Sequence, residues 1–249
     1  MGQRFGQHFL HDPCVIHQII AHFEPAKGTA VGEIGPGKGA LTKHLLTHKP
    51  LTLFEIDPVW IKHWRSYDAH VIAGDVLQQS FVDYLPEGVA KWSLIGNLPY
   101  QISGPFMAKC VSERHVIDIG WFMMQKEMVM RCVAPLGDEH YSALSIWLQR
   151  YFHLKASFKV LPGSFSPPPK VDSQMLWMKP RTDVKPCVSE DDLHQLLRAV
   201  FRYRRKTIGR ILKHLSIQIP SEAPFSLTLR PQQMTEDDFI WLLAQSAGE

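Results

Sequence analysis

Short apolar runs that end on polar or glycine residues recur along the first half of the chain. Their composition is typical of buried strands, and the segments between them carry the periodicity of amphipathic helices. Strands that alternate with helices predict βαβ units and therefore a parallel sheet of the α/β class. The predicted strands are Thr29 to Gly35, Leu51 to Asp57, His70 to Asp75, the run from Ser93 to Asn97, and Val116 to Met124.

Helical patterns flank these strands. Asp12-Pro13 has the form of an N-cap followed by a first-turn proline, and the apolar residues from Val15 to Phe23 then fall on one helical face. A second helix is expected over Ala40 to Thr47. Beyond Gln125-Lys126-Glu127 we expect one helix and then another over roughly Tyr141 to Phe152.

The pattern changes near residue 160. Leu161 to Lys170 is too rich in proline to form a helix or a strand, whereas Val171 to Lys179 alternates like a final strand. Pro180 to Pro186 has the composition of a linker. We therefore predict an α/β domain over residues 1–180 and a small all-helical domain over residues 181–249. In the second, Ser189-x-x-Asp192 and Thr235-x-x-Asp238 resemble capping boxes.

The composition fits a soluble globular protein of 249 residues, with 45% hydrophobic and 20% charged residues. The net charge of +3 is modest, so any contact with nucleic acid must come from local clusters of basic residues. The four cysteines are far apart and form no C-x-x-C pair, which argues against a zinc ribbon or a disulfide framework. No signal pattern and no apolar run of about 18 residues is present, so we expect a cytosolic protein without a membrane span.

Four consecutive predicted strands end on a glycine, an acidic or an amide residue. These residues are Gly35, Glu55, Asp75 and Asn97. In an open parallel sheet, ligands bind beyond the carboxyl ends of the strands. Gly35-x-Gly37-x-x-Ala40 satisfies a dinucleotide-binding pattern, and Glu55 follows Gly35 by twenty residues, where a ribose-binding acid belongs. The glycine turn alone therefore does not exclude a nicotinamide-dependent oxidoreductase.

The segment Asn97-Leu98-Pro99-Tyr100 suggests a holder for an amine. An Asn side chain has one acceptor and two donors. Pro99 has no N–H, which leaves its neighbour's carbonyl free to act as a second acceptor, and Tyr100 offers a flat face for stacking. The alternative is an ordinary Asn-x-Pro turn at a strand end. Together with Asp75, the segment favours S-adenosyl-L-methionine with an adenine amine as methyl acceptor over a nicotinamide cofactor.

Several separated motifs resemble one family. Glu33-Ile34-Gly35-Pro36-Gly37 and Asn97 to Tyr100 resemble the nucleotide and catalytic motifs of class I methyltransferases that act on amines. Arg4 to Leu10, Phe165 to Ser173 and Arg204-Arg205-Lys206-Thr207 resemble the ribosomal RNA adenine dimethyltransferase family, and within it the bacterial enzymes of the small subunit. The resemblance runs from residue 3 to about residue 241.

The resemblance implies a Rossmann-like methyltransferase sheet and dimethylation of adenosines in small-subunit ribosomal RNA, with a role in ribosome biogenesis. It implies a cofactor pocket for S-adenosyl-L-methionine that is lined by His8, Leu10, Gly35, Glu55, Asp75 and Asn97. It further implies that the catalytic residues are Asn97, Leu98, Pro99, Tyr100 and Phe165. Asn97 and the Leu98 carbonyl would hold the target amine, and Tyr100 and Phe165 would stack on the flipped adenine. We expect a monomer that binds the small ribosomal subunit, without a metal. The sequence departs from the family pattern at His8, Gln101 and Ala143, where Asn, Asn and Arg are usual.

A basic segment lies near the C-terminus. No acidic residue occurs between Leu193 and Ser221, and the predicted RNA-binding residues are Arg202, Arg204, Arg205, Lys206 and Arg210. A solvated helix face normally mixes in acidic residues, so we favour contact with RNA phosphates. We expect Arg202, Lys206, Arg210 and Lys213 to share one helical stripe. The functions left open are a large-subunit RNA methyltransferase of the antibiotic-resistance type and a ribosome-assembly factor without catalytic activity.

Overall fold

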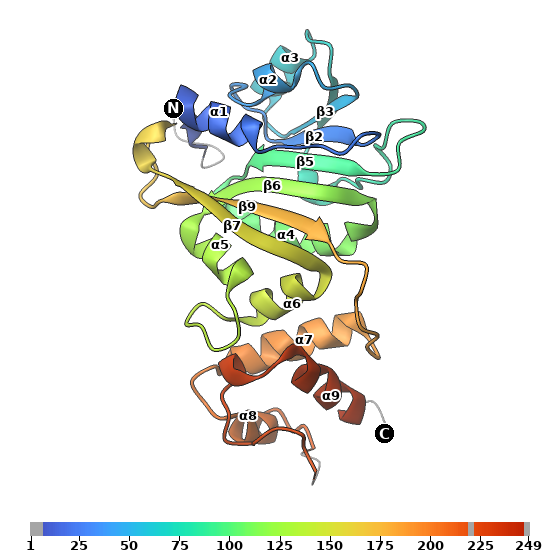
Figure 1. The fold of residues 1–249 in the computed structure, drawn as a ribbon, viewed down its shortest axis with the longest axis vertical. Coiled ribbons are helices and arrows are strands. Elements are labelled where there is room, and N and C mark those ends of the chain that lie inside the picture. Colours follow the sequence, from blue (N-terminus) through green and yellow to red (C-terminus); the bar gives the residue numbers. More distant parts are fainter. Residues whose placement is uncertain (1–6, 219–221, 247–249) are drawn as a thin grey trace. The chain divides into compact units, whose positions relative to one another are not determined.

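A computed structural model describes residues 7–218 and 222–246, in two compact units (Figure 1). The sheet unit comprises Met1–Val129 and Phe152–Pro180, and the helical unit comprises Met130–Tyr151 and Arg181–Glu249. This grouping places the segment Met130–Tyr151 with the helical unit, whereas the predicted division at residue 180 places it with the sheet. Arg4, Phe5 and Gly6 of the first family motif lie outside the described residues.

The sheet unit contains a seven-stranded sheet in the order β4-β3-β2-β5-β6-β9-β7. Its first five strands pair in parallel, and β9 pairs antiparallel with both β6 and β7. The α/β fold with a Rossmann-like sheet is therefore confirmed. The strands are β2 (Ala30–Ile34), β3 (Leu51–Glu55), β4 (His70–Ala73), β5 (Trp92–Asn97), β6 (Ile117–Gln125), β7 (Phe152–Val160) and β9 (Ser173–Pro180).

The central strands are buried on both faces, which explains their continuous apolar runs. Helices α1 (Pro13–Ala21), α2 (Thr42–Leu45), α3 (Pro58–Trp64) and α4 (Ser103–Ser112) belong to this unit. The predicted cap of α1 is confirmed, because Asp12 Oδ1 accepts hydrogen bonds from the amides of Cys14 and Val15, at 3.0 and 3.4 Å. Helix α2 is shorter than predicted and ends at Leu45.

Three strands of this unit are not in the sequence prediction. Strand β7 begins at Phe152, directly after a helix that ends at Tyr151, and no glycine or proline separates the two. The remaining pair is β1 (Phe9–Leu10) and β8 (Phe165–Ser166), which run antiparallel with Leu10 opposite Phe165. Residues 161–170, predicted to form a loop without regular structure, therefore provide the short 3-10 helix η4 (Pro162–Ser164) and the strand β8.

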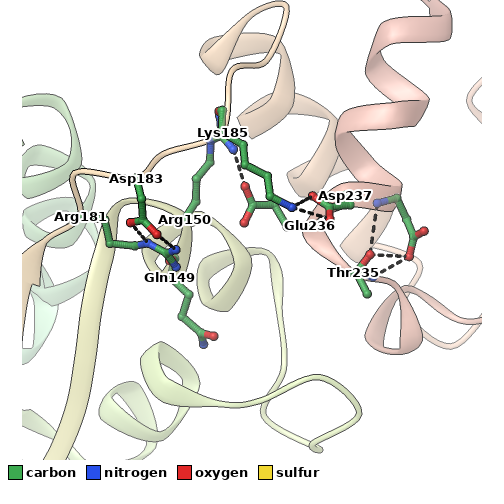
Figure 2. Close-up of polar contacts among 9 residues, drawn as sticks. Gln149, Arg150, Arg181, Asp183, Lys185, Thr235, Glu236 and Asp237 are labelled. Carbon is green, nitrogen blue, oxygen red and sulfur yellow. Dashed lines mark hydrogen bonds and ion pairs between the residues drawn. The ribbon is translucent and has the colours of Figure 1, made fainter.

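The helical unit contains α6 (Ala143–Tyr151), α7 (Glu190–Phe201), α8 (Ile208–His214) and α9 (Glu236–Ser246), while α5 (Lys126–Val133) crosses the boundary between the units. Both predicted capping segments act as caps. Ser189 Oγ accepts from the Asp192 amide, and Thr235 and Asp238 cap each other reciprocally. Charged side chains connect the segment after Arg181 to α6 and α9 (Figure 2).

No helix within residues 7–218 and 222–246 is both long enough and apolar enough to span a membrane.

Candidate active site

A cavity of about 200 Å³ lies at the carboxyl ends of β2, β3, β4 and β5. The four predicted strand-end residues, Gly35, Glu55, Asp75 and Asn97, all line it. The segment Gln7–Leu10 closes another side, so that His8 and Leu10 line the same space. The parallel sheet thus brings together Gly35 and Asn97, which are 62 positions apart in the sequence (97 − 35).

The glycine turn after β2 is held from two directions. Gly35 and Gly37 have φ angles of +67° and +49°, a conformation that favours glycine. The amide of Gly37 donates to Glu55 Oε2 at 3.0 Å, and its carbonyl accepts from Trp64 Nε1 at 2.9 Å. A Cβ atom on Gly37 would lie 3.0 Å from the Phe9 ring. The turn therefore needs both the backbone freedom and the small size of glycine.

Glu55 fixes the backbone around it. Its Oε1 accepts from the amides of Ile56 and Asp57, both at 2.9 Å, in addition to the Gly37 amide at Oε2. Burial raises the pKa of Glu55, and these backbone hydrogen bonds act against the rise. Both carboxylate oxygens are thus oriented by the main chain, beside the cavity.

Asp75 is held in a similar way at the end of β4. Its Oδ1 accepts from the amide of Leu77 at 2.9 Å and caps the short 3-10 helix η1 (Val76–Gln78). This cap fixes the carboxylate at the cavity wall.

Asn97 is oriented by the N-terminal segment. Its Nδ2 donates to the carbonyl of His8 at 3.0 Å, which assigns Oδ1 as the end of the side chain that can accept. The next residue, Leu98, donates its amide to the Met123 carbonyl at 3.0 Å. Leu98 and Pro99 both line the cavity. Asn97 therefore brings an amide oxygen that can accept a hydrogen bond to the wall of the cavity.

Two aromatic side chains, those of Tyr100 and His8, also line the cavity. The Tyr100 hydroxyl and Ser173 Oγ share a hydrogen bond of 2.8 Å, and the Tyr100 ring lies 5.6 Å from the His8 ring at an angle of 34°. Burial raises the pKa of the Tyr100 hydroxyl. His8 Nδ1 lies 2.9 Å from the Pro167 carbonyl, and because a carbonyl can only accept, Nδ1 carries the hydrogen. In neutral His8 this leaves Nε2 as an acceptor.

Phe165 is placed differently from the other predicted site residues. Its side chain is 3% exposed, does not line the cavity, and packs in the core together with Leu10. Its main chain pairs with that of Leu10, which does line the cavity. Stacking of Phe165 on a base stays a prediction.

Glu33 also lines the cavity. The predicted nucleotide motif Glu33 to Gly37 includes it but gives it no role of its own. Glu33 is 2% exposed, and its Oε2 has no hydrogen-bond partner among the described residues. Burial raises the pKa of Glu33 to about 8. The signal was present in the sequence, because a charged residue inside the apolar run Ala30–Ile34 is unusual in a strand buried on both faces.

The basic residues do not form the predicted helical stripe. Helix α7 ends at Phe201 and α8 begins at Ile208, so Arg202 to Lys206 lie in the turn between them. Arg204 donates to the Glu139 carbonyl at 2.6 Å, and the Lys206 ammonium lies 5.0 Å above the Tyr203 ring. Arg202, Arg205, Lys206 and Arg210 are exposed. The prediction of one stripe is therefore wrong, although most of these cations face solvent.

Comparison with known proteins identifies the family. Residues 2–232 match the model of the family described as ribosomal RNA adenine dimethylase. Ribosomal RNA small subunit methyltransferase A of Coxiella burnetii is 38% identical over 96% of this chain and 95% of its own length. The protein of the same name from Pseudomonas aeruginosa is 36% identical over 98% and 94%.

Solved structures agree with this result. A dimethyladenosine transferase from Plasmodium falciparum has a TM-score of 0.76 and 28% identity, covering 96% of this chain and 97% of its own. The 23S rRNA methyltransferase ErmE has a TM-score of 0.66 at 22% identity, covering 95% and 100%, and this likeness shows the fold alone. From the cavity at the strand ends, the matched family model and these relatives, we conclude that the chain belongs to the ribosomal RNA adenine dimethylase family.

Proposed function

We propose that this protein transfers methyl groups from S-adenosyl-L-methionine to the exocyclic amine of adenosines in small-subunit ribosomal RNA, giving dimethyladenosine. The observation that carries the proposal is that Asn97, whose Nδ2 donates to the His8 carbonyl and whose Oδ1 is left as an acceptor, lines the strand-end cavity next to Leu98. The names and extents of the bacterial relatives support the small subunit as the source of the RNA.

The cavity residues suit the proposed cofactor, which when bound supplies an activated methyl group on a positively charged sulfur. Asp75 and Glu55 offer carboxylates for an adenine amine and for ribose hydroxyls. The turn Gly35 to Gly37 allows close approach of a ligand to the backbone. Glu33 offers a buried oxygen, without a partner among the described residues, to a cationic group. His8 and Leu10 would cover the bound molecule.

The acceptor pair addresses the chemical weakness of the substrate. The amine of adenine is conjugated with its ring and is a poor nucleophile. When Asn97 Oδ1 and the Leu98 carbonyl accept its two hydrogens, the nitrogen is drawn toward a tetrahedral shape and its lone pair becomes available. Correct positioning against the methyl group can then contribute about 7–11 kcal/mol to catalysis. The proton leaves after positive charge has developed on the nitrogen, so the proposal requires no strong base.

The target base must leave its helix or loop to enter the cavity, at a cost of a few kcal/mol. In this proposal the Tyr100 ring, which lines the cavity, stacks on the extruded adenine. The basic residues Arg202, Arg204, Arg205, Lys206 and Arg210 contact RNA phosphates. Dimethylation requires a second methyl transfer to the same nitrogen, so the cavity must also accept the monomethylated base.

The test is transfer of tritium from labelled S-adenosyl-L-methionine to small ribosomal subunits isolated from cells that lack this methylation. We expect label in dimethyladenosine of the small-subunit RNA, and none when subunits already methylated at those adenosines are supplied. Transfer only to large-subunit RNA would identify the antibiotic-resistance type of activity instead. Stable binding to immature subunits without transfer would identify an assembly factor and contradict the proposal.

A further inference from the structure

One face of the strand pair β7–β9 is only partly covered at the edge of the sheet (Figure 1). Antiparallel partners point to the same face, so Lys155, Trp177 and Trp121 form one row across β7, β9 and β6. Trp121 is 3% exposed, and its Nε1 donates to the Ile19 carbonyl of α1 at 3.0 Å. Trp177 is partly exposed and Lys155 is exposed. Helix α1 therefore covers the row at β6 and leaves its β7 end in solvent.

The uncovered end of this face is basic. The pair His153 and Lys179 points the same way as Lys155, because the residues lie two positions along their strands, and all three are exposed. The side chains of Lys155 and Lys179 have no ion pair within residues 7–218 and 222–246. Neither β7 nor β9 contains an acidic residue.

Aromatic rings lie beside these cations. The Phe158 ring is 5.8 Å from that of His22 and 6.2 Å from that of Trp121. Phe158 and Trp177 both pack against the core and are both partly exposed. The face therefore combines exposed cations with two aromatic side chains that the core covers only in part.

Lysines on an edge strand have a simpler explanation, since they prevent a sheet from pairing with other chains. This accounts for Lys155 and Lys159 in β7. It does not account for Lys179 and Trp177, because β9 is an inner strand that lies between β6 and β7. Cations that can meet phosphates, beside aromatic rings that can stack on bases, are typical of surfaces that bind single-stranded nucleic acid.

We propose that the β7–β9 face, defined by His153, Lys155, Phe158, Trp177 and Lys179, binds an unpaired segment of ribosomal RNA. The two ammonium groups contact phosphates, and the indole of Trp177 stacks on a base. None of the five residues lines the strand-end cavity, so this contact is additional to the site of the target adenine. The inference rests on the proposed function, because that function makes RNA the substrate.

Binding of the full chain to transcribed small-subunit ribosomal RNA, without cofactor and over a range of salt concentrations, tests the two lysines. The double variant Lys155→Gln and Lys179→Gln should flatten the logarithmic salt dependence by about 1.4, since each single-strand phosphate contributes about 0.7. The matched control is Lys62→Gln with Lys91→Gln, which removes two exposed lysines of the sheet unit outside β7 and β9. This control should keep the wild-type slope.

Two further variants test the stacking of Trp177. Trp177→Leu removes the flat ring and should lower RNA affinity about five-fold or more at constant salt, whereas Trp177→Phe keeps a ring and should retain most of the affinity. Circular dichroism establishes that both variants are folded. Ultraviolet crosslinking of the wild-type protein to the RNA, followed by mass spectrometry of its peptides, tests the contact without a variant and should identify β7 or β9.

The outcomes distinguish this inference from the proposed function. A wild-type slope in the double lysine variant, or unchanged affinity in Trp177→Leu, would overturn the inference and leave the methyltransferase proposal standing. Variants that bind RNA normally but bind intact small subunits more weakly would also overturn it, and would identify a ribosomal protein as the partner. A wild-type protein that binds the RNA but transfers no methyl group would contradict the proposed function alone, because the binding assay contains no cofactor.

Discussion

The cavity of the sheet unit and the charged cluster of the helical unit hold their polar side chains differently. In the cavity of the sheet unit, three polar side chains are held by the main chain: Glu55 by amides, Asn97 by the His8 carbonyl, and His8 by the Pro167 carbonyl. In the helical unit, charged side chains pair with one another. Arg150 pairs with Glu236, Arg181 with Asp183, and Lys185 with Asp237 (Figure 2).

This difference distinguishes side chains that are available to bind a ligand from side chains that stabilise the fold. A side chain that is fixed by the main chain on one side keeps its remaining atoms for a ligand, as Asn97 keeps Oδ1. Two side chains that pair with each other satisfy both charges and leave little for a ligand. The pairs of the helical unit therefore serve to hold the segment after Arg181 against α6 and α9, and the backbone-held groups of the sheet unit form the site.

The largest effect is expected at Asn97. Asn97→Ala removes one of the two proposed acceptors for the amine and the donor to the His8 carbonyl. We expect methyl transfer to fall on the order of 10²- to 10³-fold, the usual effect of losing one preorganised hydrogen-bonding group. Cofactor affinity measured by calorimetry should change much less, because the carboxylates of Glu55 and Asp75 are retained. Transfer at the wild-type rate would refute the assignment of Asn97.

A loss of stability rather than activity is expected at Arg150. Its side chain is 1% exposed, pairs with Glu236 and donates to the Lys185 carbonyl. Arg150→Met keeps much of the volume but removes the donor to the Lys185 carbonyl and to the Glu236 carboxylate, which is 30% exposed, so the free energy of unfolding should fall by about 2 kcal/mol. Urea unfolding followed by circular dichroism measures this change.

Arg181→Met is the matched control, because Arg181 and its partner Asp183 are 32% and 65% exposed. Loss of this more exposed pair should cost below about 1 kcal/mol. If the two variants were equally stable, our interpretation that the Arg150 pair stabilises the helical unit would be wrong.

The same comparison explains how much of the molecule the sequence predicts. Gly35, Glu55, Asp75 and Asn97 could be assigned to one site because the ends of neighbouring parallel strands converge, whatever the lengths of the connections. The caps at Asp12, Ser189 and Thr235 were also predictable, since each depends on residues two or three positions away. These features need only local sequence and the sheet order.

Features that depend on distant pairing could not be predicted in this way. Strands β1 and β8 each have two residues and exist because they pair with each other across more than 150 positions. The prediction of a basic stripe on one helix was wrong because the residues between Phe201 and Ile208 form a turn, although their spacing fits a helix. Arg204, which falls on the apolar side of such a helix, instead bonds to the Glu139 carbonyl.

The smallest effect, on RNA binding, is expected from substitutions in the turn between α7 and α8, where cationic side chains are exposed. Charge reversal at Arg205 and Lys206 should weaken RNA binding and flatten its dependence on salt, by about 0.9 in the logarithmic slope for each duplex phosphate that the protein no longer neutralises. Filter binding to small-subunit RNA over a range of salt concentrations measures the slope. Lys27→Glu changes an exposed cation of the sheet unit and should leave the slope nearly unchanged. Equal slopes for all proteins would mean that this turn binds no phosphate, because counterion release follows the number of phosphates neutralised.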